Sequence, residues 1–280
     1  MHQYQIGLAV SESFGFPIAE SFAHLKQHGL EATFTGLGTP EDRHVWADQC
    51  AKHGLIYSSI HAPFKRAADI WEDTLNGDEG ERELYASIDA CVEVGAPITV
   101  VHPFIGFDKH EPTPIGLTRM CRVAEYAANK NIKVAIENVE GEEYLDYLMA
   151  GLRDHDSIGF CLDTGHEVCY NRGRDLLADY GDRLCYLHIN SNVGITSPEG
   201  IITYKDDAHM LPFDGKADMN FLVERLKKHQ YKGILMMELA RRNHKDRNTN
   251  DRYLAMAPDE YLAEAAAQIK RLRDMMEATV

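Results

Sequence analysis

Short apolar runs alternate with longer amphipathic stretches along the whole chain, and this alternation most limits what the chain can fold into. Eight of the runs predict strands, because each is short, apolar and bounded by turn or polar residues. They span residues 5–10, 30–36, 55–61, 98–103, 133–139, 158–163, 184–190 and 233–239. Eight strand–helix units in a chain of this length predict a single (β/α)8 TIM barrel, an α/β fold that takes residues 1–280 as one domain.

The stretches between the runs favour helices at 18–29, 81–95, 116–131 and 219–230, with a last helix near 258–277. Gly29, Gly54 and Gly95 stand where three helices should stop, as expected of C-terminal caps. An open doubly wound sheet is the alternative fold, but no G-x-G-x-x-G follows the first strand. Nothing in the pattern marks a domain boundary, so the barrel is the preferred interpretation.

Six of the predicted strands carry a carboxylate or an imidazole at their end. These residues are His61, His102, Glu137, Asp163, His188 and Glu238. Because all strands of such a barrel end at one mouth, the six side chains are expected to converge there. Charged groups beside Val, Ile and Leu are costly to bury unless they are paired or bind a cation, and oxygen and nitrogen donors suit a divalent metal. A helix-capping Asp163 is the ordinary alternative for that residue alone.

Three further residues extend this group. His166 follows Asp163 by three positions, and the long segment 191–217 contains Asp207 and His209. With one residue between them, Asp207 and His209 can face the same ion, and His166 can complete a three-ligand site. The alternative is that Asp207 and His209 order a polar loop. Long segments also follow other strands, at 62–80, 104–112 and 240–257, and all fall at the mouth where barrels build active sites.

Other side chains of these segments suit a substrate pocket. Phe64, Trp71, Phe104 and Phe107 are expected either to enclose a substrate or to pack within their loops. The pair that directly follows the last strand, Arg241 and Arg242, suits either a phosphate group or solvent.

The composition limits which partners and which cellular location are expected. The net charge is −15, from 29 basic and 44 acidic residues, which disfavours nucleic acid. The six cysteines form no C-x-x-C pair, and most fall in apolar stretches, so we expect reduced thiols and a cytoplasmic location. No signal peptide or apolar stretch of about 18 residues is present, so no membrane is expected. The apolar stripe of the last helix suits either a homo-oligomer contact or packing on the barrel.

The strand-end motifs resemble a known family. The stretches "SIHAPF", "VVHPF", "AIENV", "CLDTGH", "LHIN", "DAH" before a Pro and a Gly, and "MMEL" occur in this order. Together they resemble the xylose isomerase-like barrel superfamily, which contains sugar (phosphate) isomerases and epimerases and zinc-dependent apurinic endonucleases. The resemblance covers about residues 55–240 and does not separate these members.

The resemblance implies a divalent metal, zinc or manganese, and room for more than one ion. Its primary ligands would be Glu137, Asp163, His188 and Glu238. Additional ligands in the endonuclease branch would be His61, His102, His166, Asp207 and His209. In the sugar branch some of these positions hold substrate hydroxyls instead, and we assign that role to His61 and His166.

The implied activity is isomerisation or epimerisation of a small sugar or sugar phosphate through an enediolate, with Glu137 and Glu238 as the acid–base pair. A small-molecule sugar is therefore the expected partner. The alternative is a zinc-dependent phosphoesterase of the apurinic endonuclease kind. The segment after His188 is not rich in Arg and Lys, which argues against that alternative.

Overall fold

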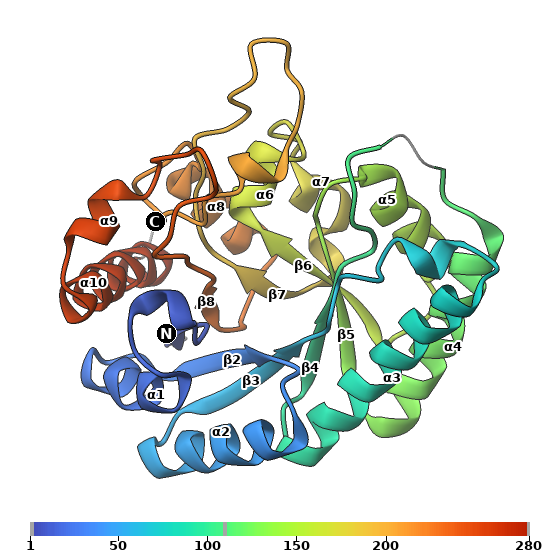
Figure 1. Cartoon of the computed structure of the whole chain (residues 1–280), viewed down its shortest axis with the longest axis horizontal. Helices are drawn as coiled ribbons and strands as arrows, with labels where there is room; N and C mark the ends of the chain where they lie inside the picture. Colours follow the sequence, from blue (N-terminus) through green and yellow to red (C-terminus); the bar gives the residue numbers. More distant parts are fainter. Residues whose placement is uncertain (1–2, 109–110, 279–280) are drawn as a thin grey trace.

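A computed structural model describes residues 3–108 and 111–278, whose strands form a barrel with helices around the outside (Figure 1). The strands are β1 (Ile6–Leu8), β2 (Ala32–Gly36), β3 (Ile56–His61), β4 (Ile98–Val101), β5 (Lys133–Glu137), β6 (Ile158–Asp163), β7 (Leu184–His188) and β8 (Leu235–Met237). They are parallel and run in the order β7-β6-β5-β4-β3-β2-β1-β8. The predicted (β/α)8 barrel is confirmed.

One narrow contact closes the barrel between β7 and β8. Beyond the end of β7, Ile189 forms an isolated parallel bridge with Met237. The amide of Ile189 donates to the carbonyl of Met236 at 2.7 Å, and the amide of Glu238 donates to the carbonyl of Ile189 at 3.3 Å. The neighbouring strands β1 and β8 pair in parallel over three residues. The seam between β7 and β8 is therefore sparsely bonded, as is the join of β1 with β2, which pair only at Gly7 and Ala32.

The helices connect successive strands on the outer face. They are α1 (Ile18–Gln27), α2 (Pro40–His53), α3 (Leu75–Val94), α4 (Pro114–Lys130), α5 (Glu142–Gly151), α6 (Thr164–Cys169), α7 (Leu176–Tyr180), α8 (Met219–Lys228), α9 (Asp251–Ala255) and α10 (Pro258–Glu277). Four 3-10 turns supplement them: η1 (Glu12–Phe14), η2 (Asp69–Trp71), η3 (Gly181–Arg183) and η4 (Tyr204–Asp206). Within the described residues, none of the helices has both the length and the apolar composition of a bilayer crossing.

Capping residues explain where the helices begin and end. Gly54 and Gly95 end α2 and α3 with φ of 62° and 73°, the left-handed conformation that glycine adopts without strain. α3 begins at Leu75, earlier than the predicted 81, because the Thr74 hydroxyl accepts the amide of Gly77 and caps an additional turn. The segment expected as loop at 62–80 is therefore shorter, and the segment 240–257 contains α9.

The barrel interior is filled by a small apolar layer that includes Ala135, Cys161, Tyr186 and Met236. Residues two positions apart on a strand point to the same face. The next inward-facing positions, toward the carboxyl ends of the same strands, are therefore occupied by the four predicted ligands Glu137, Asp163, His188 and Glu238. The pairing of Asp163 with His188 across β6 and β7 fixes their level in the barrel. The long segment after β7, gold to orange in Figure 1, projects beyond this end.

Candidate metal centre and active site

Four predicted ligands meet at the carboxyl ends of β5 to β8. Glu137, Asp163 and His188 are the last residues of their strands, and Glu238 directly follows β8. One ligand atom of each lies within 4.8 Å of those of the other three. Glu137, Asp163 and His188 are fully buried, whereas the Glu238 side chain is 23% exposed. The structure brings these side chains together, and their role as metal ligands stays a prediction.

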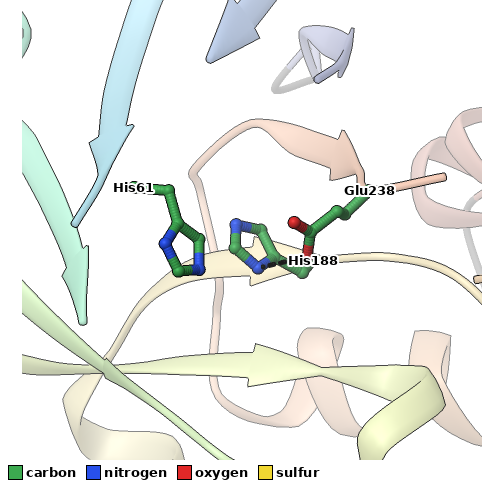
Figure 2. Close-up of side chains that lie close together, drawn as sticks. All are labelled: His61, His188 and Glu238. Carbon is green, nitrogen blue, oxygen red and sulfur yellow. Dashed lines mark ion pairs between the residues drawn. The ribbon is translucent and has the colours of Figure 1, made fainter. Parts of the chain in front are cut away.

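Three imidazoles surround the Glu137 carboxylate. His188 Nδ1 lies 2.8 Å from Glu137 Oε1 and 3.0 Å from Glu238 Oε2. The Nε2 atoms of His61 and His102 both lie 3.2 Å from Glu137 Oε2. In Figure 2, His61 comes from β3, His188 from β7, and the Glu238 carboxylate reaches back toward the His188 ring. Glu137 therefore lies at the centre of the group.

A second group lies beside the first. Asp207 Oδ2 is 3.1 Å from His166 Nε2 and 3.0 Å from His209 Nε2. Asn192 holds the segment, since its Oδ1 accepts the amides of Ala208 and His209 while its Nδ2 donates to Asp207. The backbone φ of His209 is 44°, a strained value for a residue other than glycine. The structure thus brings together the expected three-residue set.

Two asparagines that the sequence analysis did not single out position Asp163. Asn190 Nδ2 donates to Asp163 Oδ2 at 2.6 Å, and Asn138 Oδ1 accepts the Asp163 amide at 2.7 Å. Gly165 leaves room for this contact, because a Cβ there would lie 1.8 Å from Asn190 Oδ1. Both asparagines belong to the motifs "AIENV" and "LHIN". The sequence signal that could have identified these two residues is a side-chain amide at the end of an otherwise apolar strand, since a buried amide needs hydrogen-bond partners.

Burial and the neighbouring imidazoles oppose each other at the two glutamates. Burial alone raises the pKa of the Glu137 carboxyl, but His188, His102 and His61 outweigh it and hold that pKa well below its usual value. Burial likewise acts on Glu238, yet His188 lowers the Glu238 pKa to about 2. Both glutamates are therefore ionised at neutral pH.

The two aspartates differ from each other. Burial outweighs the attraction of His166 at Asp163 and raises the pKa of that carboxyl to about 6. At Asp207 burial is outweighed by His209 and His166, so its pKa lies well below the usual value. Burial lowers the pKa of His209, but Asp207 outweighs it and raises the pKa to about 10. Among the four carboxylates, Asp163 is therefore the one whose ionised form is least stabilised by neighbouring positive charges.

The donor set fits a divalent ion. Carboxylate oxygens and imidazole nitrogens converge, and no lysine or arginine of the described chain forms an ion pair with the four carboxylates. Two buried atoms beside them, His188 Nε2 and Asn190 Oδ1, have no hydrogen-bond partner among the described residues. Buried charge without a permanent counter-charge is costly, and a bound cation removes that cost.

A cavity of about 620 Å³ opens above the group. Its inner end is lined by His61, His102, His166 and Glu238. Its mouth includes exposed aromatic residues, and its lining has both apolar and polar side chains, as expected of a small-molecule site.

The aromatic residues of the loops divide into two kinds. Phe64 and Phe107 line the cavity and are 41% and 45% exposed. Trp71 is buried and donates its indole N–H to the carbonyl of Pro103, and Phe104 is 2% exposed. Trp71 and Phe104 therefore pack within the loops, the alternative interpretation of their sequence positions.

The sequence and the fold together define the class of protein. Residues 9–275 match the model of the xylose isomerase-like TIM barrel family, and the chain belongs to that family. The resemblance drawn from the strand-end motifs is thereby confirmed. The chain is also 28% identical to the uncharacterised protein y4fM of Sinorhizobium fredii, over 81% of this chain and 76% of that protein.

Solved structures of the same fold include two sugar enzymes. The 3-keto-D-glucoside 4-epimerase YcjR from E. coli matches with a TM-score of 0.71 at 17% identity, covering 96% of this chain and 100% of that chain. The D-allulose 3-epimerase from Methylomonas sp., in complex with D-allulose, matches with a TM-score of 0.69 at 16% identity, covering 97% and 98%. At these identities the likeness shows the fold alone.

Proposed function

We propose that this chain is a divalent-metal-dependent epimerase or isomerase of a small sugar. The observation that carries the proposal is the meeting of Glu137, Asp163, His188 and Glu238 beneath a cavity of about 620 Å³. The names of the two structural neighbours, both sugar epimerases, support the reaction class. The cytoplasmic location and the pairing of copies stay predictions.

The residues would hold the metal in two places. The first ion would be held by Glu137, Asp163, His188 and Glu238, with His102 beside Glu137. A second could be held by His166, Asp207 and His209. These donors suit zinc or manganese. A bound divalent ion polarises a substrate carbonyl and so acidifies the neighbouring C–H bond.

Glu137 and Glu238 are the acid–base pair of the proposal. They contact the His188 ring nitrogen from separate strands, at 2.8 and 3.0 Å, so they approach one point from different sides. One carboxylate removes a proton from the substrate carbon and later releases it to solvent. The other takes up a proton from solvent and delivers it to the opposite face or the adjacent carbon. His61 and His166, which line the cavity, orient substrate hydroxyls.

Isosteric variants test this assignment. Glu137→Gln or Glu238→Gln should lower turnover of ketoses by about 10²–10⁴-fold, the usual contribution of a general acid or base. Exchange of the substrate C–H with deuterated solvent, followed by NMR, measures proton removal directly. Glu125→Gln, at an exposed position of α4, is the matched control. Unchanged turnover in either active-site variant would exclude the proposed pair.

A zinc-dependent phosphoesterase of the apurinic endonuclease kind is the second candidate. It is favoured by the second ligand group of His166, Asp207 and His209, since several clustered ions can clamp a phosphodiester. The net charge of −15 opposes binding of a phosphate backbone. Cleavage of an abasic DNA duplex by the zinc-loaded protein, with no ketose turnover, would select this candidate.

A further inference from the structure

A second hollow, of about 410 Å³, adjoins the main cavity. Phe107 and Glu140 line both, so the two spaces meet at these side chains. The second hollow lies among the segment after β4, the start of α5 and the tip of the segment 191–217. Each volume falls within the range of about 300–1,000 Å³ of small-molecule sites, so the pair offers room beyond a single sugar ring.

An aromatic wall leads from the metal centre into this hollow. The Tyr170 ring lies 4.9 Å from the His166 ring and 5.9 Å from the Phe107 ring. Phe107 is 45% exposed and lines both cavities, so its ring is accessible to a ligand in either. Flat aromatic faces pack well against the C–H faces of a ring. A substrate that extends beyond the metal centre therefore has a continuous surface to follow.

Polar groups face each other across the second hollow. Glu140 is 9% exposed, its Oε1 accepts the amide of Gly106 at 2.9 Å, and no described lysine or arginine forms an ion pair with it. On the other side, Arg172 donates from Nη2 to the carbonyl of Gly200 at 3.2 Å, which leaves other guanidinium N–H groups for a ligand. Acceptors and donors in one hollow match hydroxyl groups, which both donate and accept.

Resting on the proposed function, we propose that the substrate carries a second, uncharged hydroxylated unit beside the unit with the carbonyl group, as a ketose-containing disaccharide does. This unit lies in the second hollow against Phe107, Glu140 and Arg172. The hollow is lined by the carboxylates of Asp108, Glu140 and Glu143 and by one guanidinium, so a negatively charged unit is disfavoured.

A phosphorylated monosaccharide is the rival, and only one of the two arginines after β8 suits it. Arg241 donates to the carbonyls of Tyr253 and Met256, so its guanidinium is held by the fold. Arg242 lines the main cavity and is exposed. A phosphate would therefore be recognised at Arg242, away from the second hollow.

The test compares ligands on the metal-loaded full chain by calorimetry and by turnover. D-Fructose is the single-ring probe, turanose and isomaltulose are disaccharides with a free ketose unit, and fructose 6-phosphate tests the rival. We expect at least one disaccharide to bind about tenfold or more tightly than D-fructose, a difference that one or two additional hydrogen bonds supply.

Substitutions test whether the preference for a disaccharide arises in the second hollow. Arg172→Ala removes donors from the second hollow, and Ile201→Trp, at a 59% exposed position of the loop tip, fills it. Each should lower the ratio of disaccharide to fructose affinity by about tenfold. Arg153→Ala, whose partner Asp154 is exposed, removes an arginine far from both hollows and should leave the ratio unchanged.

The outcomes separate this inference from the proposed function. Turnover of fructose without any disaccharide preference overturns the inference and keeps the function. A disaccharide preference that Arg172→Ala abolishes, with no turnover of any ketose, keeps the inference and overturns the function. Tightest binding of fructose 6-phosphate, or no binding of either disaccharide at millimolar concentration, also overturns the inference.

Discussion

Two buried clusters of charged side chains meet at the short helix α6, and they are built differently. His166 points into the cluster at the barrel mouth, where five imidazoles face four carboxylates. The next residue, Glu167, points outward and accepts two hydrogen bonds from Arg225, at 2.7 and 2.8 Å. Arg225 also donates to Asp175 at 2.9 Å. The outer cluster is thus closed by a permanently charged guanidinium.

The difference is in line with a structural role for the outer cluster and with the proposed ligand-binding role of the mouth cluster. Arginine stays protonated at all ordinary pH values, so Arg225 compensates Glu167 without help from solvent or ions. An imidazole compensates a carboxylate only while it is protonated. The mouth cluster therefore lacks a permanent counter-charge, which the proposed cation would supply, whereas the outer cluster holds α6, and with it His166, in place.

Loss of a mouth ligand should have the largest effect. His188→Ala removes the imidazole that contacts both glutamates, and we expect the bound metal to be lost and turnover to fall by about 10³-fold or more. Metal content is measured by elemental analysis and turnover on the best ketose. A variant that keeps stoichiometric metal and full turnover would show that the mouth cluster is structural, like the outer one.

Loss of the guanidinium should act on stability instead. Arg225→Ala leaves Glu167 buried without a counter-charge, and we expect the free energy of unfolding to fall by about 3 kcal/mol or more. Urea unfolding measures this, with Arg82→Ala as control, because Arg82 forms an exposed pair with Glu79. Turnover per folded molecule should fall far less than in His188→Ala, because Arg225 acts on His166 only through α6. A loss of stability no greater than in the control would remove the distinction between the clusters.

Replacing each of the two supporting asparagines should weaken a different half of the mouth cluster. Asn190→Ala frees Asp163 and should weaken the first ion by about 10–100-fold, while Asn192→Ala frees Asp207 and should weaken the second ion by a similar factor. Competition with a chelating indicator resolves the two affinities. Asn220→Ala, at an exposed position of α8, is the control. Equal weakening of both ions by either variant would mean that the two groups form one site.

The smallest effect is expected at a third cluster, in which Glu81 is buried but its partner Arg122 is 47% exposed, and Arg119 remains 3.7 Å from Glu81. Burial raises the pKa of Glu81, but Arg122 and Tyr85 outweigh it, so the folded-state pKa lies below the usual value. Such a carboxylate stabilises the fold above about pH 4.5 and loses this contribution as the pH falls through its folded-state pKa. Arg122→Gln should therefore cost less than about 1 kcal/mol at neutral pH, with a difference that shrinks in acid. Urea unfolding across a pH series measures it.

The convergence of the strand-end carboxylates and imidazoles could be predicted because it depends on local pattern. An apolar run that ends in Asp163 or His188 reveals both the strand and the side chain at its end. The barrel then brings these ends together whatever the details of packing. Even so, Glu238 lies one residue past β8, because that strand is shorter than its apolar run.

Contacts that depend on packing could not be predicted. Glu167 and Arg225 are 58 residues apart, and nothing in either helix indicates the other as partner. Asn190 and Glu140 act through side-chain geometry that only the folded mouth defines. The extension of α3 to Leu75 depends on a single capping hydroxyl, that of Thr74.

The sparsely bonded seam between β7 and β8 lies directly under the proposed ion. His188 is on one side of it and Glu238 on the other, and few main-chain hydrogen bonds join the two. A cation shared by these side chains would act as a cross-link over this sparsely bonded joint. Catalysis and mechanical closure would then depend on the same atom, and amide exchange at Ile189 and Glu238 would report its occupancy.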